Sequence, residues 1–249
     1  MNLPVQVVEA ATRRRCILFS GRRASLEVLP EHIPDEATLA RSLVDRRCSL
    51  PEALGAVETE LGRSKLEESL KQFYAPQELA PGVFHHTAVT QFPVIFTTAW
   101  DDLFEQAASR AGVDFDVSYR GEPLPEPEPK RLKIHKLVGG FERQGSVAAT
   151  ANHRRQTPLP ADQKRYWRKL LRDHVALFVG YRPDEAEFEI LFDELVAGYG
   201  GALPRTHWAV SQGRISDVQW QKWVWRGMLL FTGDPSEVAE TLPSNHTDA

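Results

Sequence analysis

The stretch PVIFTTAWDDLFEQA, residues 93–107, joins an apolar run to an acidic, amphipathic run. Residues 93–98 have the β-branched and aromatic composition of a buried strand, and Asp101 and Asp102 place acids in the first turn of a helix. A strand that passes directly into a helix is half of a βαβ unit. In sheets built from such units, ligands bind at the carboxyl ends of the strands. The residue at this turn is Ala99, whose methyl group has no acid–base chemistry.

The same pattern recurs along the chain, because amphipathic runs separate further apolar runs. Continuous apolar strands are typical of a parallel sheet that is buried on both faces. The predicted strands are 16–20, 93–98, 131–138, 175–180, 206–210 and 227–231, and the predicted helices are 35–47, 51–73, 101–111, 161–173, 184–198, 216–225 and 235–242. This order predicts an α/β fold, a doubly wound Rossmann-like parallel sheet with helices on both faces.

The length of 249 residues suits one large α/β domain, so we predict a single domain over 1–249. Residues 35–75 are helical in pattern and too long for one crossover. They predict a small inserted helical lobe packed beside the sheet. The proline-rich stretch 121–130 predicts an extended loop, and residues 243–249 predict a flexible tail.

The composition excludes several classes of function. A net charge of -4 gives no electrostatic reason to expect direct binding of nucleic acid. No apolar run approaches the ~18–20 residues needed to span a bilayer, and the N-terminus lacks the apolar region of a signal peptide. Cys16 and Cys48 are too few for a four-cysteine zinc site, so no metal is expected. Two scattered thiols favour a reduced, cytoplasmic protein, with a single disulfide as the alternative.

The loop after the first predicted strand reads GRRAS, residues 21–25. Glycines at this place allow backbone N–H groups to approach a pyrophosphate. Only Gly21 has that property, because Arg22 and Arg23 put long side chains where a glycine-rich loop has almost none. Arginine contacts phosphate directly, but it also fills space that a dinucleotide needs. A ligand-binding loop and an ordinary turn both stay open.

Three other segments raise the same choice between a site and a structural role. Thr98, Trp100 and Asp101 either line a pocket or belong to a capped helix start. Val138-Gly139-Gly140 is a tight turn after a strand, and Gly180-Tyr181 is another. His135 lies in mid-strand, where a packed or surface residue is the more frequent role. Trp220, Trp223 and Trp225 favour core or interface packing.

Taken in order, these segments resemble the motifs of the SIR2-like family, especially its bacterial antiphage-defence branch, whose members cleave NAD. The family runs strand-GAG-x-S, T-[TQ]-N-x-D-x-L, K-[LI]-H-G and F-[VL]-G-Y-S-x-x-D. Here these motifs read FSGRRAS, TTAWDDL, KLVG and FVGYRPDEAEF. The resemblance extends over about residues 14–242, including THWAVSQG near the C-terminus, and leaves no room for a second domain. The zinc ribbon of the protein deacetylases is missing.

The departures from the family pattern lie at its catalytic positions. The resemblance implies an Asn that orients a water and a His that acts as general base on the nicotinamide ribose; the matching residues are Ala99 and Val138. Arg22 and Arg23 replace the second and third residues of GAG, and Arg182 replaces the Ser after Gly-Tyr. Losing one acid–base group costs about 10²–10⁴ in rate. We therefore expect no catalytic residue at these positions.

The remaining matches imply a nucleotide site. In the family, the Asp that matches Asp101 contacts the nicotinamide amide. The expected ligand is NAD or an ADP-ribose-like nucleotide. The candidate cofactor-binding residues are Gly21, Arg22, Arg23, Ser25, Thr98, Trp100, Asp101, Gly139, Gly180 and Tyr181.

These observations predict a catalytically degenerate SIR2-like domain that acts as a structural, regulatory or nucleotide-binding subunit of a defence complex. The expected partners are a second copy, an active SIR2-like protein, an Argonaute-like protein or an ATPase, with no membrane contact. One alternative is an active NAD glycohydrolase with a rearranged or partner-completed site, in which His135 or His153 acts as base. The other is a sensor that holds a different phosphorylated ligand through Arg22, Arg23 and Arg182.

Overall fold

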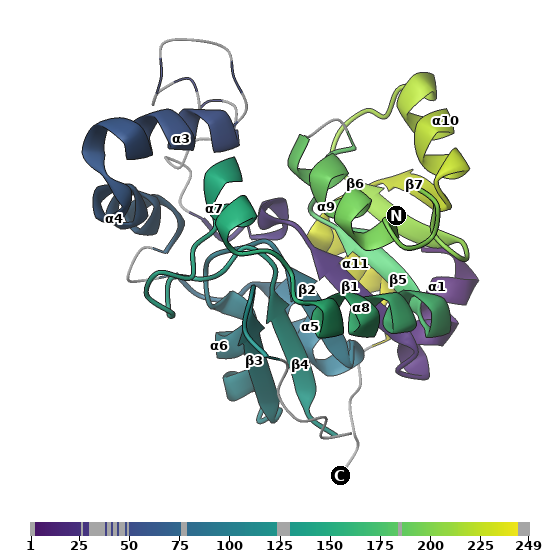
Figure 1. Cartoon of the computed structure of the whole chain (residues 1–249). Helices are drawn as coiled ribbons and strands as arrows, with labels where there is room; N and C mark the ends of the chain where they lie inside the picture. Colours follow the sequence, from purple (N-terminus) through teal and green to yellow (C-terminus); the bar gives the residue numbers. More distant parts are fainter. Residues whose placement is uncertain are drawn as a thin grey trace.

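A computed structural model of the chain describes residues 3–25, 27–29, 38, 41, 44, 48, 50–75, 79–123, 130–183 and 186–243. Within these ranges, seven parallel strands form one sheet in the order β3-β4-β2-β1-β5-β6-β7 (Figure 1). The strands are β1 (Cys16–Ser20), β2 (Val94–Thr97), β3 (Phe115–Tyr119), β4 (Leu132–Lys136), β5 (Val175–Val179), β6 (His207–Ser211) and β7 (Met228–Thr232). The predicted doubly wound α/β fold is confirmed.

Helices connect the strands and cover the sheet. They are α1 (Val5–Thr12), α3 (Leu50–Leu61), α4 (Arg63–Tyr74), α5 (Val83–Gln91), α6 (Leu103–Arg110), α7 (Ala151–Gln156), α8 (Ala161–Asp173), α9 (Ala186–Val196), α10 (Asp217–Trp225) and α11 (Pro235–Thr241). A short 3-10 helix, η1 (Arg22–Ala24), follows β1 directly.

The strand order reverses at β1, which has β2 on one side and β5 on the other. In the register, Ser20 at the end of β1 pairs with Thr97 of β2 and with Val179 of β5. The loops after these three strands therefore leave the sheet at the same level. A doubly wound sheet binds its ligands in the crevice at such a reversal.

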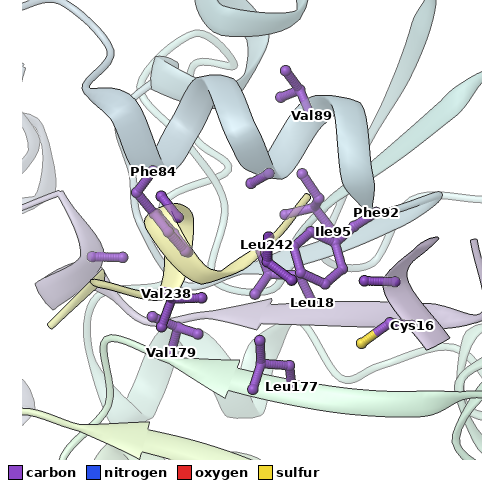
Figure 2. Close-up of a cluster of buried hydrophobic side chains, with 14 of the residues drawn as sticks. Cys16, Leu18, Phe84, Val89, Phe92, Ile95, Leu177, Val179, Val238 and Leu242 are labelled. Atoms are coloured by element: carbon purple, nitrogen blue, oxygen red, sulfur yellow. The ribbon is translucent and has the colours of Figure 1, made fainter. Parts of the chain in front are cut away.

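The core lies on both faces of the sheet, which explains why the strands are apolar without interruption. Side chains alternate between the faces, so Leu18 of β1 packs under one layer of helices while Phe19 packs under the other. Helices α1, α5, α6 and α11 cover the first face, and Figure 2 shows α5 and α11 side chains meeting β1, β2 and β5 there. Helices α8, α9 and α10 cover the second face.

An aromatic row crosses the second face of the sheet. The Phe19 ring stacks on Phe178 of β5 and on Phe96 of β2, with ring centroids 4.5 Å apart in each pair. Phe96 stacks in turn on His135 of β4 at 4.8 Å. Stacked pairs of this kind contribute about 0.5–1.5 kcal/mol each beyond their buried area. The row joins the four central strands across the reversal point.

Helices α3 and α4 form a lobe at one end of the molecule, and α7 packs against α3 (Figure 1). The prediction of one helix over 51–73 is wrong, because Gly62 separates α3 from α4 with a φ of +83°. Glycine takes this left-handed conformation without a steric penalty, and the chain turns there. Most of the predicted helix at 35–47 lies outside the described residues.

Other differences from the predicted elements have simple physical reasons. β3, with sequence FDVSY, is an edge strand that is half-buried at four of its five positions, so it lacks a continuous apolar signal. The helices α1, α5 and α7 were also not predicted. Residues 124–129 of the proline-rich loop and 244–249 of the tail lie outside the described residues, and the single-domain expectation stays a prediction. Among the described helices, none has the length and apolarity required to cross a membrane.

The three clustered tryptophans of α10 separate into two environments. Trp223 is fully buried and packs on Phe188 at 4.7 Å and Phe192 at 4.9 Å between ring centroids. Trp220 is 46% exposed and Trp225 is 86% exposed. The prediction of core packing therefore holds for one of the three.

Candidate functional site

The sheet brings the four motif segments together at its carboxyl end. Gly21 N–H donates to the Val179 carbonyl at 2.8 Å, and Thr98 N–H donates to the Ser20 carbonyl at 3.0 Å. Leu137 N–H, just after β4, donates to the Thr97 carbonyl at 2.8 Å. The ends of β1, β2, β4 and β5 are thus tied to one another by backbone hydrogen bonds. The motif segments therefore lie together at the carboxyl ends of these strands, which is where the sequence predicts that a ligand binds.

The glycines of the site are required by close packing of backbone against backbone. A Cβ atom on Gly21 would overlap the Gly180 carbonyl, although the φ of Gly21 is ordinary. Gly180 has a φ of +76°, and a Cβ there would overlap the backbone nitrogen of Ala24. Gly139 combines a φ of +80° with contact against the Ser146 carbonyl. The loops after β1 and β5 therefore fit directly against each other.

Arg22 lies inside the site rather than at its surface. Its guanidinium carbon is 4.4 Å from the centroid of the Trp100 ring, and the two residues are 6% and 1% exposed. Tyr74 of α4 packs edge-on against Trp100 at 5.4 Å between ring centroids. The cation–π pair therefore joins the loop after β1 to the loop after β2, and Trp100 also contacts α4 of the lobe. Arg23 is half-buried, and Arg182 is exposed.

The two positions that match the family's catalytic residues are packed against apolar groups. Ala99 is 1% exposed, and its N–H donates to Thr97 Oγ1 at 3.0 Å. Val138 is 3% exposed and belongs to the cluster that joins Trp100 to the helical lobe. This cluster also contains Leu50, Ala53, Leu54, Val57, Leu66, Leu70, Tyr74, Val147, Ala148 and Ala149. Val138 therefore acts as a packing residue between the sheet and the lobe.

Asp101 is the buried acid of the site. Burial raises the pKa of its carboxyl to about 6, while nearby Lys136, the Leu103 N–H and a hydrogen bond from Ser25 oppose this rise. Leu103 N–H donates to Asp101 Oδ1 at 3.2 Å at the start of α6. The side chain thus orders the strand-to-helix turn. A carboxyl with this pKa changes its protonation in the physiological range.

His85 joins Ser25 and Asp101 in a buried chain of hydrogen bonds that sequence analysis missed. Gly82 N–H donates to His85 Nδ1, and His85 Nε2 lies 3.3 Å from Ser25 Oγ. Because Nδ1 accepts, Nε2 bears the hydrogen and donates to Ser25, whose hydroxyl hydrogen bonds to Asp101. Burial lowers the pKa of His85 to about 3. This imidazole cannot accept the serine proton, so the three residues form a structural chain rather than an activated nucleophile.

Lys136, at the end of β4, is a second group that sequence analysis missed. Its ammonium is 2.9 Å from Glu105 Oε1 of α6 and also donates to the Asp101 carbonyl. Glu105 and Asp101 raise the pKa of Lys136 against the opposing effect of burial. The lysine stands in the motif KLVG, so the sequence signal was present. Its role, which is to hold α6 against β4, depends on Glu105, a residue of α6 that the motif does not include.

The two histidines considered as alternative bases lie elsewhere. His135 is stacked in the aromatic row under α8, and its Nδ1 is 2.5 Å from Ser118 Oγ. Burial lowers the pKa of His135 to about 3. His153 Nε2 pairs with Glu58 Oε1 at 2.5 Å and connects α7 to α3. His135 is therefore a packed strand residue, and His153 joins α7 to the lobe.

The family of the chain follows from a comparison with family models. The model described as SIR2-like domain matches residues 93–228, which is more than half of the chain. The chain belongs to the SIR2-like domain family. No curated protein sequence matches it.

Solved structures of Sir2 proteins share the fold. A structure from work on the mechanism and regulation of Sir2 enzymes has a TM-score of 0.54 at 12% identity, with 96% of each chain covered. A Sir2 bound to acetylated peptide has a TM-score of 0.52 at 13% identity, with 94% of each chain covered. A Sir2 homolog–NAD complex has a TM-score of 0.50 at 15% identity, covering 96% of this chain and 92% of that one. At these identities the likeness concerns the fold.

Two polar side chains of the site lack a hydrogen-bond partner in the part of the chain that the structure describes. Ser20 Oγ and Thr98 Oγ1 are buried at the ends of β1 and β2, and neither has a hydrogen-bond partner within the described residues. Such groups suit a polar ligand. Ala99 and Val138 are buried beside them, and the Arg22 guanidinium lies over the Trp100 ring. No group of three or more metal-ligating side chains occurs in the described ranges.

Proposed function

We propose that this SIR2-like domain does not cleave NAD and serves as a binding or regulatory subunit. The observation that carries the proposal is the environment of Val138, which is 3% exposed within the apolar cluster between the sheet and the lobe. A general base requires an ionisable group that reaches the reacting atom, and an apolar side chain offers none. Ala99 removes the water-orienting group from the neighbouring strand.

The test is an assay of nicotinamide release from NAD by the purified chain. We expect no release above the level of a buffer control, both for the chain and for Asp101→Ala. The alternative of a partner-completed active site predicts release when a SIR2-like, Argonaute-like or ATPase partner is added. NAD consumption that Asp101→Ala abolishes would overturn the proposal, whether or not a partner is needed.

A role as sensor of a phosphorylated ligand is the second candidate, and Ser20 Oγ and Thr98 Oγ1 favour it. Arg22 and Arg23 follow β1 and Arg182 follows β5 in the chain, and guanidinium groups bind phosphate through paired hydrogen bonds. Calorimetry with NAD, ADP-ribose and phosphate separates the two roles. Saturable binding that is lost in Thr98→Val and Ser20→Ala supports the sensor, and no heat from any of these ligands contradicts it.

The subunit role requires a protein partner, and the expectation of a defence complex rests on the resemblance of the motifs. A structural feature that supports a partner is the exposure of Trp225 and Trp220 on α10. Tryptophan is enriched at protein interfaces and is seldom this exposed on an isolated domain. Size measurements on the chain with and without candidate partners test this role, with Trp225→Ser as the variant and Val5→Ser, exposed on α1, as its control.

A further inference from the structure

A basic surface lies away from the candidate site, on α8 and at the amino end of the sheet. It surrounds two cavities of about 290 and 520 Å³. Their cationic lining residues, which we call the basic surface, are Arg13, Arg15, Arg165, Arg168, Lys169, Arg172 and Arg205. Glu9, Asp162 and Asp173 are the acids in the same linings. Seven cations and three anions leave a local excess of four positive charges in a chain whose net charge is -4.

The smaller cavity lies where α1 ends and where β5 and β6 begin. Arg13, Arg15 and Arg205 line it, and the side chains of these three form no ion pair or hydrogen bond within the described part of the chain. Trp208 forms part of its wall. The basic side chains are therefore available to a ligand.

The backbone between Arg13 and Arg15, two residues that line this cavity, adopts a left-handed conformation. Arg14 has a φ of +53° and closes α1 by letting Arg15 N–H donate to the Ala10 carbonyl at 2.7 Å. Glycine or asparagine usually occupies this place in a helix terminus. A left-handed arginine costs about 1–2 kcal/mol, yet the chain keeps arginine at 13, 14 and 15. The Arg14 side chain donates to the Thr90 carbonyl at 3.3 Å, whereas Arg13 and Arg15 line the cavity.

The larger cavity lies along the outer side of α8. Arg165, Arg168, Lys169 and Arg172 line it together with two aromatic rings, Tyr166 and Tyr199. The Tyr199 hydroxyl donates to the Arg168 carbonyl, which holds that ring at the cavity. Arg168 Nε is buried without a hydrogen-bond partner within the described residues. The lining thus combines four cations with two aromatic rings.

The two cavities meet at one ion pair. Arg172, from the larger cavity, donates to Asp173 Oδ1 at 3.0 Å, and Asp173 lines the smaller cavity. The linings of the two cavities therefore adjoin at the C-terminal end of α8, where Arg172 contacts Asp173.

We propose that the basic surface binds single-stranded nucleic acid. A repeating phosphate backbone matches cations spread over two connected cavities better than one small anion does, because a single phosphate would engage only one of them. Tyrosines beside the cations supply flat surfaces on which bases stack, and this combination is the usual one for strand binding without sequence preference. The net charge of the whole chain is negative in spite of this basic surface, and the proposal therefore departs from the expectation of no direct nucleic-acid contact.

The test uses the whole chain and a fluorescent oligothymidylate of about 20 nucleotides, with affinity read by anisotropy at several salt concentrations. The variant combines Arg15→Gln, Arg165→Gln, Lys169→Gln and Arg205→Gln. The control combines Lys71→Gln, Arg110→Gln, Arg155→Gln and Arg214→Gln, which are exposed elsewhere and change the net charge by the same amount. Melting curves of both variants check that each is folded.

We expect the variant to bind at least about tenfold more weakly than the wild type and the control to bind within about twofold of it. Each lost phosphate contact reduces the magnitude of the slope of log affinity against log salt concentration by about 0.7. Four lost contacts therefore reduce it by about 3. Equal binding by the variant and the control, or no binding by the wild type, overturns the proposal. Equal affinity for thymidine monophosphate, a DNA duplex or heparin also overturns it, because a strand would then not be the preferred ligand.

Photo-crosslinking with 5-iodouracil in the oligonucleotide gives a second measurement that does not depend on the variants. We expect crosslinked peptides that contain Tyr166 or Tyr199. Crosslinks confined to peptides around Trp100, at the carboxyl end of the sheet, would place the strand in the candidate site and contradict the proposal.

Discussion

The carboxyl end of the sheet and the basic surface differ in where they lie in the fold and in which charged side chains they offer to a ligand. The carboxyl end has the position of a ligand site, at the reversal of strand order, but Arg22, Trp100 and Val138 are buried there, with Arg22 over the Trp100 ring. The basic surface has no such topological advantage, yet it presents arginines without ion-pair partners within the described residues. Fold position therefore does not by itself decide which end of this molecule binds a ligand.

The difference lies in what each arginine is paired with. Arg22 is 6% exposed, and its guanidinium lies over the Trp100 ring, which packs against the lobe. Arg205 is exposed and lines a cavity. A cation that is held against an aromatic ring contributes to stability, whereas one that stands in water is available for an anion. The predictions below compare the two ends on that basis.

The largest effect is expected for Gly180→Ala, which tests how tightly the carboxyl end is packed. The φ of +76° and the overlap with Ala24 together predict a loss of about 3–5 kcal/mol in the free energy of unfolding. Gly200→Ala is the control, because its φ is +73° but no atom lies within 4 Å of the added Cβ. Its expected loss is about 1–2 kcal/mol. Urea unfolding measures both, and equal losses would show that the two loops do not fit closely.

The next effect concerns the pH dependence of stability through Asp101. Burial raises the folded-state pKa of the Asp101 carboxyl from 3.8 to about 6. The contribution of this carboxyl to the free energy of unfolding is therefore complete below pH 4 and is lost as the pH rises through 6. Two pKa units correspond to about 3 kcal/mol. Between pH 4 and pH 7, we expect the free energy of unfolding of the wild type to fall by about 2–3 kcal/mol relative to that of Asp101→Asn. Ser25→Ala removes a hydrogen bond to the carboxylate and should move the decline to higher pH. A constant difference between wild type and Asp101→Asn contradicts this account.

Restoring the family's histidine is expected to destabilise the protein. Val138→His places an imidazole in the apolar cluster, at a cost of about 1–3 kcal/mol that grows as the pH falls and the ring becomes charged. Val138→Ile is the apolar control and should cost less than about 1.5 kcal/mol. Thermal melts at pH 5 and pH 8 measure both variants. A Val138→His protein as stable as wild type would mean that the position faces water or a polar cavity.

The smallest effect separates the arginines of the two ends. Arg22→Gln removes the cation–π contact with Trp100 and should lower the free energy of unfolding by about 1–2 kcal/mol. Arg205→Gln should leave the melting curve unchanged, because its side chain is exposed and unpaired within the described residues. If both substitutions had the same effect on stability, the contrast between the two ends would fail.

Much of the fold could be predicted because local patterns determine it. The apolar runs around Phe19, Phe96 and Phe178 are buried on both faces, so they read as parallel strands without knowledge of their neighbours. β3 was missed because an edge strand is half-buried and has a mixed composition. The single helix predicted over 51–73 was wrong because Gly62 turns the chain within an otherwise helical pattern.

The location of the candidate site was also predictable, since its motifs follow the strands in order. The contacts within it were not. His85, Ser25 and Asp101 come from three separate segments, and no periodicity connects them. The basic surface was hidden for the same reason, because its arginines lie at 13, 15, 165, 168, 172 and 205 and only their sum enters the net charge.

The sequence by itself determined the parallel strands, the glycine turns after β1, β4 and β5, and the absence of an acid or base at Ala99 and Val138, because each of these depends on residue type and local pattern. Only the tertiary structure decided that Arg22 packs on Trp100, that Val138 belongs to the contact with the lobe, and that distant arginines form one surface. These outcomes depend on which segments the folded chain brings within a few ångströms of one another. Desolvation and the pairing of charges depend on neighbours within a few ångströms, and those neighbours come from distant segments that no single stretch of sequence includes.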